Sequence, residues 1–420
     1  MTNEEKKLGR KPRTPARRLL GAVMLFYFLA FFLLGLKDYS WQAFLLSVFV
    51  PVIILVGVVG LPKLFPADRL LLSLTNFLCA LGVLVLFRLD PDRGLTQAVN
   101  FGVGVAAMLV CTLAVRYVKS WKLLTILLML GSMGLLALPL VMGKETNGAK
   151  NWVSIAGFGF QPSELVKLSL ILCVSYCLSR RQVFVSVAFA GACLMILMLQ
   201  KDLGTALLYY GVTLLLLYAA TGSGLLAGLG CAGGAGAAVL GYSMFAHVKK
   251  RVAVWLNPWA DYQNSGYQIV QGLIAIANGG LFGVGLGLGN ASVIPESYND
   301  YIFSVIAHEF GVIFAVFVLL IYLAVILRGI SIARQSDSTF HSLLALGCAV
   351  LIGLQTFVIV GGNIKLIPLT GVTLPFISYG GTSLVSSLCV IGLLQGVAAR
   401  NRARIKEDKR LAMYQEEDAL

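Results

Sequence analysis

The chain has few charged residues and very few histidines for its length. Asp, Glu, Lys and Arg make up 12% of its 420 residues, histidine occurs three times, and hydrophobic residues reach 58%. One soluble core cannot hide that much apolar surface, because a soluble fold needs polar residues on its outside. The composition excludes an ordinary soluble protein and predicts a chain whose solvent is hydrocarbon.

The sequence also lacks a disulfide framework and paired metal ligands. Cys173 and Cys177 are four residues apart, but no histidine or carboxylate lies near them. Packing in a core therefore explains this pair better than metal binding or redox chemistry. All eight cysteines fall within predicted spans, at Cys79, Cys111, Cys173, Cys177, Cys193, Cys231, Cys348 and Cys389.

Long apolar runs are present instead. Runs of about 17 to 25 residues recur along the chain, which is the length that a helix needs to cross a membrane. The first run follows a basic stretch but has no clear cleavage site, so we expect an uncleaved anchor. The predicted spans are 19–36, 41–61, 70–87, 97–117, 122–142, 163–179, 182–200, 203–220, 223–246, 302–328, 340–362 and 381–398.

Most of the basic residues lie in short loops on one side of these spans. By the positive-inside rule both termini are cytoplasmic, which fits an even number of spans. Because the basic residues flank a membrane, anionic lipid headgroups explain the formal charge of +14 better than nucleic acid. They are Lys6, Lys7, Arg10, Lys11, Arg13, Arg17, Arg18, Arg116, Lys119, Lys122, Arg180, Arg181, Arg328, Arg334 and the run from Arg400 to Arg410.

Three loops on the opposite, extracytoplasmic side are long and rich in polar residues: 143–162, 247–301 and 363–380. The pattern from Tyr267 to Leu281 predicts a helix at the membrane surface. The glycine run 279–289 follows no strand, so we interpret it as a re-entrant or interfacial turn rather than a dinucleotide site. Segments this irregular lie at membrane depth only where protein or a cavity surrounds them.

Ionisable residues in or beside the spans are the candidates for chemistry, because charge at membrane depth is costly. Glu164 and Lys167 share one helix face, where they either neutralise one another or line a polar cavity. Asp300 directly precedes a span, and a helix cap is the structural alternative to a catalytic role. His308 and Glu309 are expected to pack against other helices.

Six motifs occur in order along the chain: GAKNW (148–152), QPSELVK (161–167), KDLGTALL (201–208), NPWADYQNSGYQIVQGLIAI (257–276), IPESYNDYIFSVIAHEFG (294–311) and PLTGVTLPFISYGGTS (368–383). Together they resemble the SEDS family (shape, elongation, division and sporulation), whose members RodA and FtsW are peptidoglycan glycosyltransferases. The resemblance implies an all-α polytopic membrane protein with a ten-helix core at 70–400 and an added hairpin at 19–61, about twelve spans in all. Segments 1–18 and 401–420 are expected to be charged cytoplasmic tails.

The family's essential aspartate falls on Asp300. In the family reaction a sugar hydroxyl of one lipid-linked disaccharide attacks the anomeric carbon of another, and polyprenyl pyrophosphate leaves. A carboxylate can take the hydroxyl proton, and cations must stabilise the pyrophosphate. Asp300 is thus expected to be the general base or a ligand of a divalent Mg or Mn ion. The expected substrate-binding residues are Trp152, Lys150, Glu164, Lys167, Asp202, Arg251, Glu296, Lys365 and Ser378.

The resemblance also implies a location and partners. We expect lipid II, the lipid-linked disaccharide-pentapeptide, as the substrate at the outer face of the bacterial cytoplasmic membrane, and a class B penicillin-binding protein as the partner. A transporter of lipid-linked precursor is the alternative, since intramembrane Glu and Lys also suit a translocation path. A non-catalytic scaffold would not need Asp300. The residues do not separate roles in elongation, division and sporulation.

Overall fold

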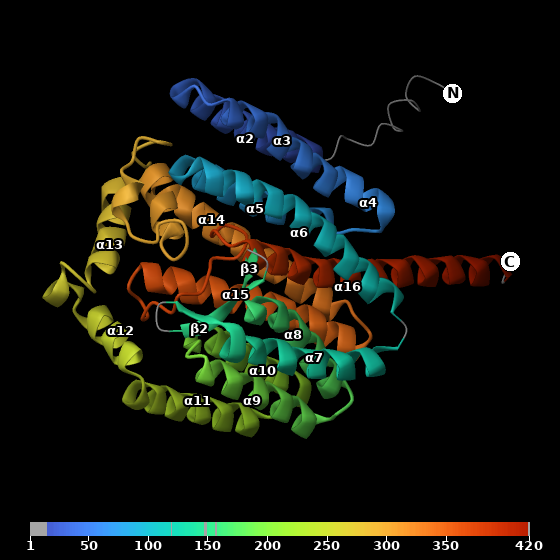
Figure 1. The fold of residues 1–420 in the computed structure, drawn as a ribbon. Coiled ribbons are helices and arrows are strands. Elements are labelled where there is room, and N and C mark those ends of the chain that lie inside the picture. The colour runs from blue at the N-terminus through green and yellow to red at the C-terminus, as the bar shows by residue number, and fades with distance from the viewer. Residues whose placement is uncertain (1–14, 119, 147–148, 156–157, 419–420) are drawn as a thin grey trace, which may run out of the picture.

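The protein is a bundle of long helices with one small sheet in a loop at one end (Figure 1). The computed structural model describes residues 15–118, 120–146, 149–155 and 158–418. Most of the predicted basic tail, residues 1–14, lies outside this range, as do Lys119 and the first residue of the GAKNW motif.

The structure has the following elements. The first helices are α2 (Pro15–Asp38), α3 (Trp41–Leu55), a π-helical turn (Val56–Gly60), α4 (Leu61–Leu64), α5 (Arg69–Leu89), α6 (Pro91–Tyr117) and α7 (Trp121–Met142). The strands are β1 (Lys144–Thr146), β2 (Ala149–Ile155) and β3 (Phe158–Phe160). The remaining helices are α8 (Pro162–Ser179), α9 (Val183–Leu199), α10 (Leu203–Thr221), α11 (Gly224–Met244), α12 (Ala246–Leu256), α13 (Tyr267–Gly279), α14 (Ile302–Arg334), α15 (Thr339–Asn363) and α16 (Gly381–Asp418).

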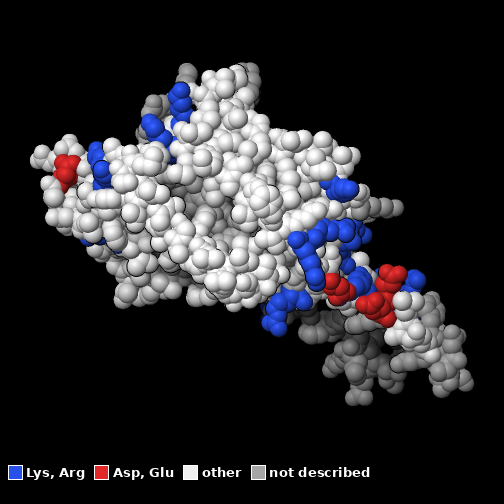
Figure 2. All heavy atoms as spheres, turned by 90° about the horizontal axis from the view of Figure 1, so that it is seen from below, with Lys and Arg blue, Asp and Glu red and all other residues white. Residues whose placement is uncertain are grey.

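The described chain forms a multi-pass membrane protein. Among its described residues, eleven helices are long and apolar enough to cross a membrane, and the shorter α9 is the remaining predicted span. Charged atoms gather at the two ends of the molecule in Figure 2, and the band between them is nearly free of charge. This distribution is what a hydrocarbon layer around the middle of the bundle requires.

The predicted segments differ from the structure mainly in detail. Loop 143–162 contains a three-stranded antiparallel sheet in the order β1-β2-β3, which apolar periodicity did not indicate. Helix α6 begins at Pro91, before the predicted 97, because Asp90 caps it and accepts hydrogen bonds from Asp92 and Arg93. Helix α16 continues through the charged segment that follows its span, to Asp418, and extends beyond the bundle (Figure 1).

The added hairpin, α2 and α3, packs along α5 (Figure 1). Tyr27 is fully buried and donates a hydrogen bond to the carbonyl of Phe77 on α5 at 2.7 Å. At the far end of α2, Lys37 donates to the carbonyl of Gly287 at 2.6 Å. The hairpin therefore contacts the core helix α5 and also the glycine-rich turn that leads towards Asp300.

Asp68 joins three helices at the opposite end of the bundle. Its side chain is 2% exposed, caps α5, and accepts hydrogen bonds from Arg328 at 2.6 Å and Arg402 at 2.8 Å. These arginines come from α14 and α16. Because a buried carboxylate needs compensation, the two cations and the helix N-terminus stabilise one arrangement of α5, α14 and α16.

Helix α14 is broken at Gly311, whose φ of 86° and ψ of 167° are not helical. A break at membrane depth frees backbone groups that lipid cannot satisfy. The glycine run 279–289 supplies their partners. The N–H groups of Val284 and Gly285 donate to the carbonyls of His308 and Glu309 at 3.0 Å, and those of Val312 and Ile313 donate to Gly280 and Leu281 at 2.9 and 3.3 Å.

The predicted packing roles of His308 and Glu309 agree with these contacts. His308 Nδ1 lies 3.0 Å from the carbonyl of Ala275 on α13. Glu309 has a fully buried side chain that pairs with Arg88 of α5 at 3.0 Å and accepts from the N–H of Gly287 at 3.2 Å. Both residues thus hold the glycine run and its neighbours against the break.

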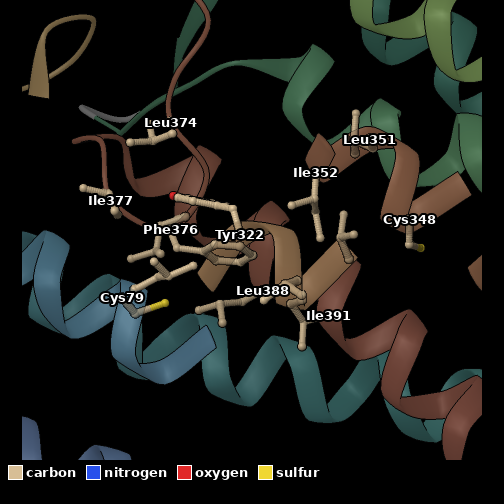
Figure 3. Close-up of a cluster of buried hydrophobic side chains, with 14 of the residues drawn as sticks. Cys79, Tyr322, Cys348, Leu351, Ile352, Leu374, Phe376, Ile377, Leu388 and Ile391 are labelled. Carbon is tan, nitrogen blue, oxygen red and sulfur yellow. The ribbon is translucent and has the colours of Figure 1, made fainter. Parts of the chain in front are cut away.

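Loop 363–380 is anchored by side chains inserted into the core. Leu374, Phe376 and Ile377 are buried, and Figure 3 shows them among side chains of the neighbouring helices, beside Tyr322 and Cys79. The Tyr322 hydroxyl donates to the carbonyl of Pro375. The segment is therefore a structured loop, as its composition predicts, and not a plain connector.

Substitution of Gly283 tests the structural role of the glycine run. Its φ of 81° suits glycine, and a Cβ there would lie 2.2 Å from the carbonyl oxygen of Glu309. Gly283→Ala should lower the free energy of unfolding by more than the about 1 to 3 kcal/mol that the backbone conformation alone costs. Thermal unfolding in detergent measures the change.

Gly102→Ala is the matched control for this substitution. Gly102 lies inside helix α6, and a Cβ there meets no atom within 4 Å. Alanine is the better helix former, so this variant should be as stable as the parent or more stable. Equal melting temperatures for the two variants would contradict the role assigned to the glycine run.

Candidate active site

A cavity of about 580 Å³ opens at the end of the bundle that carries the sheet, α12 and α13. All three long loops contribute to its wall, together with the starts of α6, α8 and α10. Seven of the residues predicted from the sequence line this cavity: Trp152, Glu164, Lys167, Asp202, Arg251, Glu296 and Asp300. Loops that are far apart in sequence thus meet around one polar space.

Asp300 lies in this wall just before α14. Its backbone carbonyl accepts a hydrogen bond of 2.6 Å from Asn363 Nδ2, at the end of α15. Oδ1 of the Asn363 side chain in turn accepts from the Ser304 hydroxyl at 3.1 Å. Asn363 is fully buried, so this clamp fixes the start of α14 and with it the position of the Asp300 backbone.

The carboxyl of Asp300 has a raised pKa. Burial and the neighbouring carboxylate of Glu296 together raise the pKa of Asp300 to about 7, against the opposing effect of the Arg251 guanidinium. The structure does not support the alternative role as a helix cap, because α14 is preceded by Tyr301 and no side chain caps it. The carboxyl is therefore free to act in the cavity.

Arg251 reaches the cavity from α12. Its guanidinium donates to the carbonyl of Thr370 at 2.9 Å, so the loop 363–380 orients it. Gly371 lies between the two charged groups: a Cβ on Gly371 would be 3.7 Å from Arg251 and 3.9 Å from Asp300 Oδ2. The backbone at Gly371, with a φ of 78°, leaves this space open beside the carboxyl.

Glu164 and Lys167 form an ion pair and also line the cavity, so the two alternatives that the sequence left open are both correct. The Lys167 ammonium donates to Glu164 Oε2, which also accepts from the Ser386 hydroxyl at 2.8 Å. The side chains of the lysine and the glutamate are 4% and 14% exposed. Much of the lysine charge is thereby neutralised within the protein.

The Asp202 carboxylate is held entirely by protein groups. It caps α10, accepting from the N–H of Thr205 at 3.1 Å. It also accepts at 3.0 Å from the Asn151 amide, the Gln161 amide and the Thr205 hydroxyl. Its acceptor positions are thus occupied, and it joins β2 and the start of α8 to α10.

Trp152 and Lys150 both lie on β2, but of the two only Trp152 lines the cavity. Trp152 is 40% exposed, which leaves an aromatic face at the cavity mouth. Lys150 is exposed outside the wall, and its backbone N–H donates to Gln200 at 3.0 Å. The structure does not bring the Lys150 ammonium to the site.

Lys365 and Ser378 also lie outside the cavity wall. Lys365 contacts the end of α12, where its carbonyl accepts from Trp255 at 3.1 Å. Ser378 is buried and donates to the carbonyl of Asn299 at 2.8 Å. These residues hold the loop 363–380 against its neighbours, beside Asp300, and do not face the cavity.

Sequence reasoning missed Arg93, which lines the cavity from the start of α6. Its guanidinium stacks 3.5 Å from the ring centre of Tyr298 and pairs with Asp90 at 3.0 Å. Tyr379, which is also in the wall, lies edge-on to Tyr298. A basic residue at the end of a span that lies opposite to most of the basic loops is the signal that would have indicated Arg93.

A divalent cation would have few protein ligands in this cavity. Within the described residues no group of three or more His, Cys, Asp and Glu side chains is placed to hold a metal. Asp300 and Glu296 are neighbouring carboxylates, however, and Mg²⁺ is commonly held by one or two carboxylates with water and substrate phosphates. The residues therefore fit a substrate-assisted metal and not a permanent all-protein site.

The chain is similar to a known family over most of its length. A family model described as a cell cycle protein, for FtsW, RodA and SpoVE, matches residues 69–403. The chain belongs to this family. Asp300, Arg251 and the whole cavity wall fall inside the matched region, whereas the hairpin of α2 and α3 precedes it.

Curated relatives in this family carry enzyme names. The chain is 36% identical over 329 residues to the probable peptidoglycan glycosyltransferase FtsW of Geobacter metallireducens, covering 72% of this chain and 84% of the relative. It is 33% identical over 371 residues to the peptidoglycan glycosyltransferase RodA of Mycobacterium bovis, covering 79% and 78%.

Solved structures of the family share the fold. A chain from a structure titled for a peptidoglycan synthase complex that coordinates polymerization and crosslinking superposes with a TM-score of 0.66 at 27% identity, covering 80% of this chain and 98% of that one. The rod shape determining protein RodA of Thermus thermophilus gives a TM-score of 0.58 at 28% identity, covering 80% and 98%.

The ion pair between Glu164 and Lys167 predicts how substitutions at these two positions change the stability of the protein. Lys167→Met leaves the Glu164 carboxylate desolvated without its cation, which should cost about 3 to 5 kcal/mol of unfolding free energy. The double variant Glu164→Gln with Lys167→Met removes both charges and should recover most of that loss. Chemical denaturation in detergent compares the variants, with the exposed Lys63→Met as a control that changes little. A double variant no more stable than Lys167→Met would disprove the pairing.

Proposed function

We propose that this protein is a peptidoglycan glycosyltransferase that joins lipid-linked disaccharide units into glycan strands. The observation that carries the proposal is the carboxyl of Asp300, which has a pKa of about 7 and lies in the polar cavity beside Arg251. A general base works best when its pKa lies near the operating pH. The names of the family's curated relatives support the same reaction.

The proposed step is one displacement at a sugar carbon. A hydroxyl oxygen of one disaccharide attacks the anomeric carbon of a second, lipid-linked one, and the new glycosidic bond replaces the bond to the pyrophosphate. Asp300 takes the hydroxyl proton, as the base does in inverting glycosidases. The electron pair of the broken bond leaves on polyprenyl pyrophosphate, which needs positive charge around it.

Arg251 is the best-placed cation for that pyrophosphate. It lies beside Asp300, is oriented by Thr370, and offers a planar fork of donors that suits phosphate oxygens. Lys167 has much of its charge taken by Glu164, and neither Lys150 nor Lys365 lines the cavity. Arg93 is a second arginine in the wall, and its stacking on Tyr298 holds it in place.

A bound Mg²⁺ or Mn²⁺ would add charge stabilisation for the departing pyrophosphate. Asp300 and Glu296 are the residues that would hold it, with substrate oxygens and water as the other ligands. In that case the proton acceptor has to be a different group. The two roles of Asp300, base and metal ligand, are separated by the pH and metal dependence of the reaction described below.

We place the cavity at the outer face of the bacterial cytoplasmic membrane, with both termini in the cytoplasm. The basic flanks of the spans support this orientation, and so does the reaction, since glycan strands are assembled outside the membrane. A class B penicillin-binding protein is the proposed partner and lipid II the proposed substrate. The relative in a peptidoglycan synthase complex supports a partnership of this kind.

Transport of a lipid-linked precursor is the weaker candidate function. A transporter places its deciding polar groups near the middle of the bilayer, between two repeats of the fold. The cavity here is built by loops and helix ends at one end of the bundle. A polymerisation assay with purified protein and lipid II, with and without chelator, tests the enzyme directly, and absence of polymer with active partner protein present would favour transport.

Substitution of Asp300 tests the chemistry. Asp300→Asn keeps the size and the hydrogen-bonding ability of the side chain but cannot take a proton or bind a metal strongly. It should lower the polymerisation rate by about 10²- to 10⁴-fold, as should Asp300→Ala. Glycan products are measured on gels, and the melting temperature is measured for both variants to show that they fold. Substantial activity in a folded Asp300→Asn protein would refute the catalytic assignment.

The raised pKa of Asp300 predicts how activity depends on pH. The base must be ionised, so kcat/KM should rise with pH up to about 7 and then level off. Glu296→Gln removes a charge that raises the pKa and should move this rise to lower pH. Arg251→Gln removes a charge that lowers the pKa and should move it to higher pH.

The metal dependence of the same profile separates the two roles of Asp300. A metal bound to the Asp300 carboxylate competes with the proton. The rise of kcat/KM with pH would therefore shift to lower pH as Mg²⁺ is added. If the enzyme turns over without metal, and added metal does not move the pH profile, Asp300 acts as the base. A profile that neither metal nor the Glu296 and Arg251 substitutions move would show that another group titrates.

A further inference from the structure

A second cavity, of about 920 Å³, lies at the other end of the bundle. Arg180 in its wall and Glu164 in the active-site wall stand at opposite ends of α8, about 24 Å apart at 1.5 Å per helical residue. The second cavity is therefore remote from Asp300 and takes no part in the proposed reaction. It lies at the ends of spans, where bilayer headgroups are located.

Three helices begin at this cavity. The residues that precede their first turns, Ser120 for α7, Gln182 for α9 and Ser338 for α15, all line it. No side chain caps any of the three starts. Their free N–H groups and the positive ends of their dipoles therefore converge on one space, which favours an anion.

His341 gives an independent indication of a ligand. It lines the cavity and is 7% exposed, yet its Nε2 has no hydrogen-bond partner among the described residues. A buried polar atom without a partner is costly and rare in folded proteins. A ligand oxygen in the cavity would satisfy Nε2, which donates in the corresponding tautomer.

The charges around the cavity are of one sign. Lys122 and Arg180 are exposed and line it, and no Asp or Glu side chain does so within the described part of the chain. Asp337, next to Ser338 in sequence, is paired with Arg404. Positive charge and helix N-termini thus act on the cavity without a competing carboxylate.

Aromatic side chains indicate that the ligand belongs to the membrane. Phe340 packs against Trp121 and Tyr176, with ring centres 5.1 and 5.7 Å apart, and all three residues line the cavity. Trp and Tyr are enriched at the level of lipid headgroups, where one side of the ring meets acyl chains. Apolar residues such as Ile126 and Met129 extend the wall along α7.

We propose that this cavity binds the phosphate of an anionic phospholipid, with Lys122, Arg180, His341 and the three helix starts around the headgroup. The lipid's acyl chains lie along α7 and the aromatic cluster. Bound lipid joins α7, α8, α9 and α15 at their ends, so it stabilises the bundle from the side opposite the active site. This inference is independent of the reaction at Asp300.

Lipid binding to the purified full-length protein tests the proposal. Native mass spectrometry gives the Kd for added phosphatidylglycerol and, as the neutral comparison, for phosphatidylcholine. The double variant Lys122→Ala with Arg180→Ala should weaken phosphatidylglycerol binding at least about tenfold, since each basic residue near a membrane surface contributes to anion attraction. His341→Phe keeps the ring and should also weaken it.

A matched double variant separates a built site from general surface charge. Arg334 and Lys406 are exposed, basic and outside the cavity wall, so Arg334→Ala with Lys406→Ala removes the same charge. This variant should change the Kd for phosphatidylglycerol by no more than about twofold relative to the parent protein. Without added lipid, the melting temperatures of all variants should match. Equal losses in the two double variants would overturn the proposal.

The remaining outcomes concern the source of the phosphate. The anion site would be overturned if phosphatidylcholine bound as tightly as phosphatidylglycerol and the substitutions weakened the binding of neither lipid. Sodium phosphate should raise the melting temperature in detergent much less than phosphatidylglycerol does. Equal stabilisation by inorganic phosphate, lost in the Lys122 and Arg180 double variant, would show a soluble ligand and overturn the lipid assignment.

Discussion

Backbone groups freed inside a membrane must find partners in the protein, and the active-site end of this bundle depends on that constraint. Helix α14 breaks at Gly311, and the glycine run 279–289 pairs with the groups released there. Only glycine permits such close contact, since a Cβ on Gly283 or Gly311 would overlap backbone atoms. The break and the run fix the path of the chain on both sides of residues 290–300, which end at Asp300.

The loops that line the cavity are also held by contacts with the core of the bundle. Loop 363–380 is held by core side chains such as Phe376, by Ser378 on the carbonyl of Asn299, and by the buried clamp of Asn363. A loop so tied keeps the carbonyl of Thr370 in place, and this carbonyl orients the Arg251 guanidinium in the cavity. The pKa of Asp300 follows from this placement: its burial beside Glu296 raises it, and only Arg251 offsets the effect.

The two ends of the bundle use charge differently. Around Asp300 both signs are present and several charges are neutralised in pairs, as in Glu164 with Lys167. At the opposite end, Asp68 fastens α5, α14 and α16 together, while the cavity at His341 has cations and helix starts but no carboxylate in its described wall.

The sequence by itself determined the spans, the three polar loops and the shared helix face of Glu164 and Lys167, because apolar length and helical spacing are local properties. It also placed Asp300 at the start of a span. Only the tertiary structure decided which cations line the cavity: Arg251 and Arg93 lie in its wall, whereas Lys150 and Lys365 do not. That choice depends on how loops distant in sequence pack at one end of the bundle, and side-chain direction there is set by contacts that no local pattern records.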